Sequence, residues 1–180
     1  MTTLGEKYKR AKRLDPLSEG FYVRVGADTW KKHAYDLTRK KDSRIGAVSS
    51  IGGFLFEEFL NYMGTDYERI SPFWETPEYT VNNKNIYVKT RRLTPRILKN
   101  KKKLYDDSLN LETFTVMISD YDLENSHDIY ICCGYNPKNR DGYVLGWTTA
   151  QTIEDIPVDE KLKYPAKCIP LKDLHPLSLF

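Results

Sequence analysis

Cysteine and long apolar runs are scarce in this sequence. The three cysteines, Cys132, Cys133 and Cys168, include no Cys-x-x-Cys pair, which argues against a zinc site or a disulfide framework and favours reduced, mostly buried thiols. No apolar run approaches the about 18 residues of a membrane span, and no apolar signal region opens the chain. We therefore expect a cytoplasmic protein without a membrane partner, in the host cytoplasm if its source is viral.

Motifs of several enzyme classes are also missing. The three histidines, His33, His127 and His175, show no His-Glu-x-x-His spacing, so the sequence does not indicate a zinc enzyme. No glycine-rich loop ends in Lys-Ser or Lys-Thr, which argues against an NTPase. What remains is a chain of 180 residues, 40% of them hydrophobic, which suffices for the core of one domain. We divide it into a basic N-terminal extension over residues 1–43, packed on or leading into the core, and a core over residues 44–180.

Acidic residues are absent from one long stretch. No Asp or Glu lies between Tyr79 and Tyr105, and residues 1–104 hold 22 Lys and Arg against 12 Asp and Glu, whereas residues 105–180 hold 6 against 13. Nine basic residues occupy the acid-free stretch: Lys84, Lys89, Arg91, Arg92, Arg96, Lys99, Lys101, Lys102 and Lys103. We expect eight of these residues to bind nucleic acid, with DNA favoured. The ninth, Lys89, belongs to the site described next. For Lys99 to Lys103, a solvated loop or helix end is the alternative.

Residues 77–90 predict a β-hairpin. Side chains alternate along a strand, so Tyr87 and Lys89 should share one face while Ile86, Val88 and Thr90 share the other. Asparagine tolerates left-handed backbone angles, which favours a turn over residues 82–85. With that turn, Glu78 and Lys89 can converge.

This hairpin resembles the motif of the PD-(D/E)xK nuclease superfamily, in which an acid opens one strand and an acid-x-Lys follows on the next. Here the motif reads Pro77-Glu78 and then Tyr87-Val88-Lys89, with Glu in place of the usual Asp and Tyr87 in place of the second acid. The segment Gly52 to Leu60 resembles the first helix of the family, which carries a metal-site glutamate. The resemblance implies a restriction-endonuclease-like α/β fold with a central mixed β-sheet flanked by helices.

The resemblance also implies a chemistry. Glu78, with Glu57 or Glu58, would hold Mg²⁺ or Mn²⁺, and Lys89 would position water for phosphodiester hydrolysis in DNA. Glu58 lies within the apolar stripe of its helix, where a buried acid needs a partner, and Glu57 points nearly opposite. The family pattern Gly-x-x-x-Glu, read from Gly53, instead favours Glu57. Both remain candidates.

Periodicity predicts the other elements. We expect a short helix or loose arm in residues 1–20, a strand over 21–25, and helices over 27–39, over 45–63 (ending near Gly64) and within 101–113. We also expect strands over 115–119, 128–134 and 143–147, with the first two separated by a polar loop over 120–127. In that loop we expect Asp120 and Asp122 to be solvated turn formers rather than metal ligands.

Two other functions stay open beside the metal-dependent nuclease. Because Tyr87 replaces a metal-binding acid, the chain could be a catalytically weakened or inactive nucleic-acid-binding protein on the same fold. Alternatively, its acidic second half could dock a partner within a phage or mobile-element assembly, which makes it a structural or interaction protein. A homodimer and a phage or host protein partner are both compatible with the sequence.

Overall fold

The computed structural model describes residues 21–38, 47–72, 75–92, 96–97, 103–104, 115–124, 127–136, 140–177 and 180. Its elements, in chain order, are β1 (Phe21–Arg24), α2 (Ala27–Thr38), α3 (Ala47–Met63), β2 (Glu68–Arg69), β3 (Glu78–Val81), β4 (Lys84–Arg92), β5 (Arg96–Ile97), β6 (Lys103–Leu104), β7 (Thr115–Ile118), α4 (Asp120–Leu123), β8 (Ile129–Asn136), β9 (Asp141–Thr148), α5 (Ala150–Glu154), β10 (Val158–Asp159), β11 (Ala166–Pro170) and the short 3₁₀ helix η1 (Leu171–Asp173).

The main sheet has six strands in the order β1-β9-β8-β4-β3-β2. Strands β4 and β8 run parallel, whereas the other neighbouring strands run antiparallel. The sheet is therefore mixed, and the α/β class expected from the sequence is confirmed. β1 comes from the expected N-terminal extension and forms an edge of this sheet, so residues 21–24 are part of the same folded unit.

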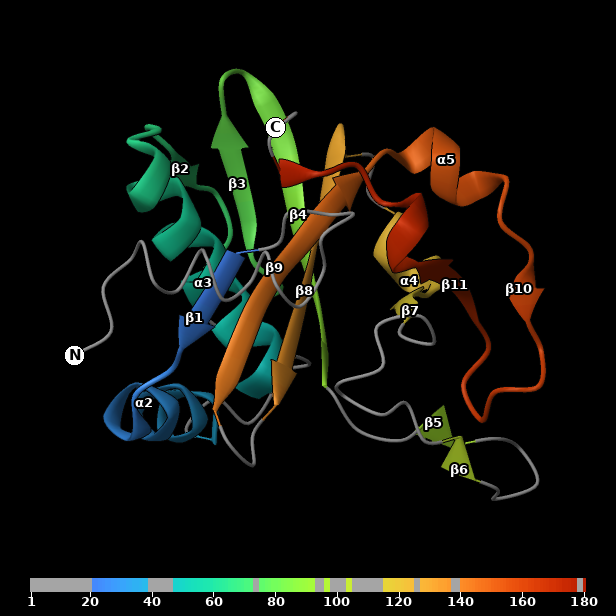
Figure 1. The fold of residues 1–180 in the computed structure, drawn as a ribbon, viewed down its shortest axis with the longest axis horizontal. Coiled ribbons are helices and arrows are strands. Elements are labelled where there is room, and N and C mark those ends of the chain that lie inside the picture. Colours follow the sequence, from blue (N-terminus) through green and yellow to red (C-terminus); the bar gives the residue numbers. More distant parts are fainter. Residues whose placement is uncertain are drawn as a thin grey trace.

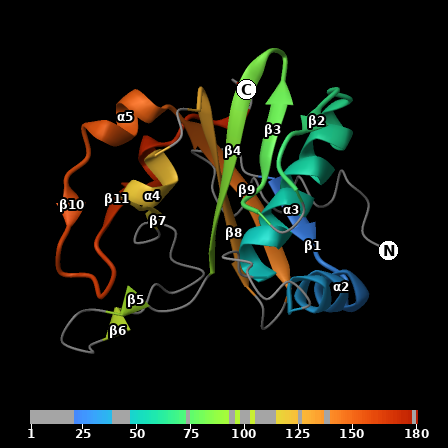
Figure 2. The same cartoon turned by 180° about the vertical axis from the view of Figure 1, so that it is seen from behind.

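Two layers cover the two faces of the main sheet. Figures 1 and 2, seen from opposite sides, place α3 against one face and α4, α5 and a second sheet, ordered β10-β11-β7, on the other. Two buried clusters match these layers. The first joins α3 to Tyr79, Ile86 and Val88, and the second joins Tyr87 and Tyr130 to the small sheet.

Helix α3 lies unusually close to β4. A Cβ atom on Gly52 would stand only 1.7 Å from Oγ1 of Thr90, so glycine is required where the helix crosses the strand. The apolar stripe expected from the sequence is buried at Val48, Ile51, Leu55 and Phe59, while Tyr62 is exposed. The helix ends before Gly64, whose φ of 66° is the left-handed conformation that commonly terminates helices.

The hairpin of β3 and β4 is confirmed. Asn82 and Asn83 have φ values of 49° and 59°, and positive φ at both central residues is the requirement of a two-residue type I′ turn. Val81 pairs with Lys84 and Glu78 pairs with Tyr87. The turn is tighter than expected, because Lys84 and Asn85 already belong to the strand.

Several other predictions can be compared with the structure. The strand at β1, the helices α2 and α3, and the strands β7, β8 and β9 are confirmed within a few residues. The polar loop over 120–127 is wrong in its first half, because Asp120–Leu123 forms α4. The helix expected within 101–113 is wrong at residues 103–104, which form β6; the rest of that range and residues 1–20 lie outside the described residues. None of the helices in the described part of the chain is long and apolar enough to cross a membrane.

Candidate functional site

The face of β4 that carries Tyr87 and Lys89 is turned away from α3. Ile86 and Val88 pack in the cluster beneath α3, whereas Tyr87 packs with Val116 and Tyr130 in the opposite cluster. The expected alternation of side chains is therefore confirmed. It places the lysine of the motif between the main sheet and the layer formed by β7 and α4.

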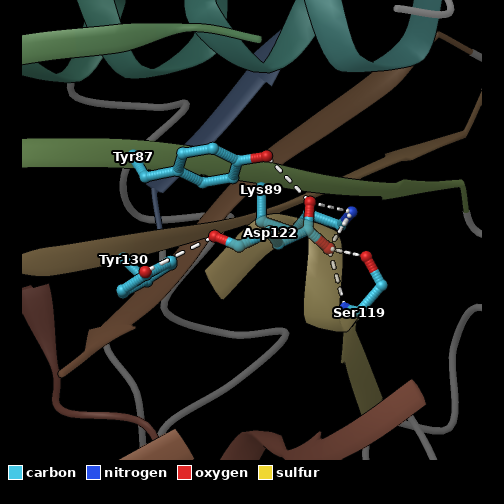
Figure 3. A network of polar contacts seen from close by, with 5 residues as sticks. All are labelled: Tyr87, Lys89, Ser119, Asp122 and Tyr130. Atoms are coloured by element: carbon cyan, nitrogen blue, oxygen red, sulfur yellow. Dashed lines mark hydrogen bonds and ion pairs between the residues drawn. The ribbon is translucent and has the colours of Figure 1, made fainter. Parts of the chain in front are cut away.

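Asp122, the third residue of α4, binds Lys89 in this layer. Its side chain is 4% exposed and that of Lys89 is 28% exposed, and Lys89 Nζ donates to Asp122 Oδ1 at 2.9 Å and to Oδ2 at 2.7 Å. Oδ2 also accepts from the backbone N–H and the hydroxyl of Ser119, both at 2.7 Å. Figure 3 shows Asp122 held between these donors. We call Tyr87, Lys89, Ser119, Asp122 and Tyr130 the Asp122 network.

The network keeps Asp122 charged. Burial favours the neutral acid, but the Lys89 ammonium and the hydrogen bonds from Ser119 outweigh it and hold the pKa of Asp122 below its usual value. An ammonium group has three donors, and Asp122 takes two of them. The third N–H of Lys89 is the part of the lysine that an approaching anion can use.

Tyr87 completes the network as a neutral donor. Its hydroxyl donates to Asp122 Oδ1 at 2.8 Å. Burial, followed by the charge and the hydrogen bond of Asp122, raises the pKa of Tyr87 far above neutrality. Tyr130 donates more weakly to the backbone oxygen of Asp122, at 3.4 Å. Because both phenols stay protonated, neither is a metal ligand at neutral pH.

Glu78 lies on the same face and meets His127. The distance between Glu78 Oε1 and His127 Nε2 is 3.5 Å, and their side chains are 29% and 7% exposed. The His127 ring makes edge contacts with Tyr87, at 5.0 Å between centroids, and with Tyr130, at 5.8 Å. Tyr87 is paired with Glu78 across the hairpin, so this tyrosine separates the Glu78–His127 pair from the Lys89–Asp122 pair.

The acids of α3 are not brought to Glu78. Glu57 accepts a hydrogen bond from the Tyr79 hydroxyl at 2.7 Å and lies 3.9 Å from Arg69 Nη1. Tyr79 belongs to the cluster beneath α3, and its neighbour Glu78 therefore points to the other face. The expectation that Glu57 points away from the sheet is wrong, and the combined site of Glu78 with Glu57 or Glu58 is not assembled, because the sheet lies between them.

Glu58 is half-buried and lies near Tyr67, whose pKa is raised by burial first and then by Glu57, with a smaller contribution from Glu58. Its place in the apolar stripe therefore leaves the Glu58 side chain partly exposed. Within the described ranges, no group of three or more His, Cys, Asp or Glu side chains is placed to hold a metal ion.

The basic residues of the acid-free stretch do not form one surface. Lys84 is exposed at the tip of the hairpin, and Arg92 is exposed at the opposite end of β4. Arg91 is buried and donates to the backbone oxygen of Thr115 on β7, so the expectation that it grips phosphate is wrong. Arg96 and Lys103 are described only as residues of β5 and β6, and Lys99, Lys101 and Lys102 lie outside the described residues.

Sequence reasoning missed Asp122, Ser119, His127 and Tyr130. Asp122 was expected to be solvated, and it is instead one of the most buried charges in the described chain. A signal for it exists: Ser119-Asp120-Tyr121-Asp122 matches the Ser-x-x-acid pattern of a capping box, in which the acid accepts from the backbone N–H of the serine. That pattern predicts the start of α4, although not the arrival of Lys89.

Comparison with protein-family models, with curated proteins and with solved structures gave no match to this chain.

Proposed function

We propose that this protein binds nucleic acid, and that its hairpin keeps the outline of a PD-(D/E)xK site in a catalytically weakened or inactive form. The observation that carries the proposal is the ion pair between Lys89 and the buried Asp122, at 2.7 Å. A lysine that must position water and steady a developing phosphorane charge needs its ammonium facing substrate. Here two of its three donors are turned inward.

The arrangement of the acids supports the same reading. Mg²⁺ is usually held by one or two carboxylates together with water and substrate oxygens. Glu78 and the acids of α3 lie on opposite faces of the main sheet, and a neutral phenol stands at the position of the second acid. Asp122 cannot easily replace that acid, because each of its oxygens already accepts at least two hydrogen bonds.

The element order supports the restriction-endonuclease-like part of the proposal. Helix α3, strands β3 and β4, helix α4 and strand β8 occur in the order of acid-bearing helix, acid-bearing strand, lysine strand, helix and further strand, with β2 between α3 and β3 and with β5, β6 and β7 between β4 and α4. The binding part of the proposal rests on the acid-free stretch, whose nine basic residues are not interrupted by an acid. Two of the nine, Lys89 and Arg91, are used within the fold, which leaves the other seven for a polyanion.

A metal-dependent nuclease is the second candidate, and one observation favours it. After burial, the charges of Asp122 and Glu78 both raise the pKa of Tyr87, so two carboxylates surround the phenol on the face of Lys89. If a divalent cation displaced Lys89 from Asp122, the freed ammonium and the two acids would form a site of the family type. Such a site would use Asp122 for the acid that Tyr87 replaces.

A binding assay and a plasmid-nicking assay separate the two functions. We expect affinity for DNA that falls as salt rises, and no cleavage that depends on Mg²⁺ or Mn²⁺. Three variants are compared with the parent: Glu78→Ala, Lys89→Ala and Lys161→Ala, the last a control on an exposed lysine of the turn between β10 and β11. Metal-dependent cleavage that survives in Lys161→Ala and disappears in the other two would establish the nuclease instead.

A further inference from the structure

One end of the main sheet gathers basic side chains from distant parts of the chain. In the register of the strands, Arg92 pairs with Tyr135, and Asp141 pairs with both Asn136 and Arg24. The last residues of β1, β8 and β4 and the first residue of β9 therefore lie at the same end. Three strand spacings separate β1 from β4, so Arg24 and Arg92 lie about 14 Å apart in the sheet direction.

Three further basic residues lie at this end. Arg140 directly precedes β9, with a φ of 60°. Helix α2 begins three residues after β1 and carries Lys31 and Lys32, and the ring of the preceding Trp30 stacks on Tyr135 at 5.3 Å between centroids. In Figure 1 this end of the sheet lies at the bottom, beside α2. We call Arg24, Lys31, Lys32, Arg92 and Arg140 the basic end of the sheet.

The charges of the basic end are available for a ligand. Arg24, Lys31, Lys32 and Arg92 are exposed and Arg140 is partly exposed. Among the residues that the structure describes, none of the five forms an ion pair with a carboxylate. The nearby Asp141 is buried and accepts a hydrogen bond from the Tyr22 hydroxyl, which leaves Asp28 as an exposed acid of this region. Among the side chains that the structure describes at this end, positive charge therefore dominates.

We propose that the basic end of the sheet binds the phosphate backbone of nucleic acid. This inference rests on the proposed function and names the surface that carries it. Arginine fits phosphate well because its planar guanidinium can donate two parallel hydrogen bonds. By strand alternation Arg92 lies on the face of α3 and Arg24 on the opposite face, so the two arginines flank the end of the sheet. The about 14 Å between their strands is close to the about 12 Å of a major groove, so they can reach phosphates on either side of it.

The position of the acid-free stretch agrees with this surface. Arg92 is the last residue of β4, so the chain that carries Arg96 and the following lysines leaves the sheet from the basic end. Lys84 is the first residue of the same strand, about 26 Å away at the hairpin tip. The basic end therefore excludes Lys84 and Arg91, and it includes Arg24, Lys31, Lys32 and Arg140, which the acid-free stretch does not contain.

The test compares two triple variants that remove the same charge. Arg24→Gln/Arg92→Gln/Arg140→Gln changes the basic end, and Lys161→Gln/Lys163→Gln/Lys172→Gln changes exposed lysines elsewhere. Affinity for a labelled duplex of about 20 base pairs is measured by fluorescence anisotropy over a series of salt concentrations, and thermal melting checks that both variants fold. We expect the arginine variant to flatten the slope of log K against log salt by up to about 2.7, and the lysine variant to keep the parent slope.

Each result decides a different question. If the parent binds duplex with a salt-dependent affinity and both variants keep its slope, the basic end is not the binding surface, while the proposed function stands. A lysine variant that loses as much slope as the arginine variant would also overturn the assignment, because general charge would then explain the binding. If the parent binds no nucleic acid, the proposed function fails as well. Binding of the parent to phosphatidylserine vesicles but not to duplex would identify the basic end as a membrane-facing surface and reject our inference.

Discussion

The Asp122 network makes a specific prediction about stability. Asp122→Asn removes the negative charge while keeping the size of the side chain, so Lys89 loses its ion pair and Tyr87 loses a charged acceptor. Removing one partner of a buried pair costs about 3–5 kcal/mol. Lys89 is 28% exposed and can regain part of its hydration. We therefore expect Asp122→Asn to lower the free energy of unfolding by about 2–4 kcal/mol at pH 7.

The matched control is Asp120→Asn, two residues earlier on the same helix. Asp120 is exposed, so this variant removes the same charge and should change stability by less than about 0.5 kcal/mol. Unfolding by urea, followed by circular dichroism, measures both variants, the single variant Lys89→Met and the double variant Lys89→Met/Asp122→Asn. In that double variant the destabilisation should be less than the sum of the two single effects, because the partners act as a unit.

The pH dependence follows from the direction of the pKa shift. The pKa of Asp122 is lower in the folded protein than in the unfolded chain. Its contribution to stability is therefore present above the unfolded value, about 3.9, and is lost as the pH falls below it toward the folded pKa. The difference in stability between the parent and Asp122→Asn should be full at pH 7 and shrink below about pH 4. A difference under about 0.5 kcal/mol at pH 7, or one that stays constant down to pH 3, would refute this account of the network.

Three other comparisons, two of them with a matched control variant, test neighbouring parts of the structure. Tyr87→Glu adds a carboxylate between Glu78 and Asp122, so we expect a lower melting temperature without metal and a rise with Mn²⁺ that the parent does not show; equal Mn²⁺ effects on both proteins would argue against metal binding at this position. Gly52→Ala should lower the free energy of unfolding by about 1–3 kcal/mol, because the added Cβ would stand 1.7 Å from Thr90 Oγ1. Gly26→Ala is the control, because its added Cβ has its nearest contact at 3.9 Å. An equal effect of the two variants would contradict the close packing of α3. Arg91→Ala should lower urea stability and Arg92→Ala should leave it within about 0.5 kcal/mol, and the reverse order would contradict the burial of Arg91.

The sequence predicted those parts of the fold that depend on residues close together in the chain. The hairpin follows from asparagines that accept positive φ and from alternating side chains on both strands, and these are properties of residues within a few positions of one another. The apolar stripe of α3 and its end at Gly64 are of the same kind. The α/β class follows from the succession of such elements.

The side of α3 that faces β3 and β4 could not be predicted from the large apolar residues of the helix. The side that faces β3 and β4 is marked by small residues instead: Gly52 lies against Thr90, and Gly53 lies against Pro77 and Tyr79. Glu57 is four residues after Gly53 and therefore lies on the same side of the helix, where it meets the Tyr79 hydroxyl. The apolar stripe was defined by large side chains alone, and on that basis this side of the helix was expected to face solvent. Glu57 was therefore expected to point away from the sheet.

The roles of Lys89 and Arg91 were also beyond local rules, because each depends on a partner far along the chain. Lys89 binds Asp122 of α4, and Arg91 binds the backbone of Thr115 on β7. Both partners belong to the layer that covers the second face of the main sheet. A run of basic residues predicts attraction for a polyanion, but it does not tell which of its members are used within the fold.

The basic residues of strand β4, which carries the family-like motif, thus have two different surroundings. Its inward basic residues, Lys89 and Arg91, bind the layer of β7 and α4, whereas its last residue, Arg92, is exposed at the basic end, where we propose that it binds phosphate. Experiment can separate the two. Variants of the Asp122 network should change stability and leave the salt dependence of nucleic-acid binding unchanged. Variants of the basic end should change that salt dependence and leave stability unchanged. If variants of the Asp122 network and of the basic end each changed both stability and the salt dependence of binding, the packing of the two layers and the binding of a polyanion would be coupled through β4.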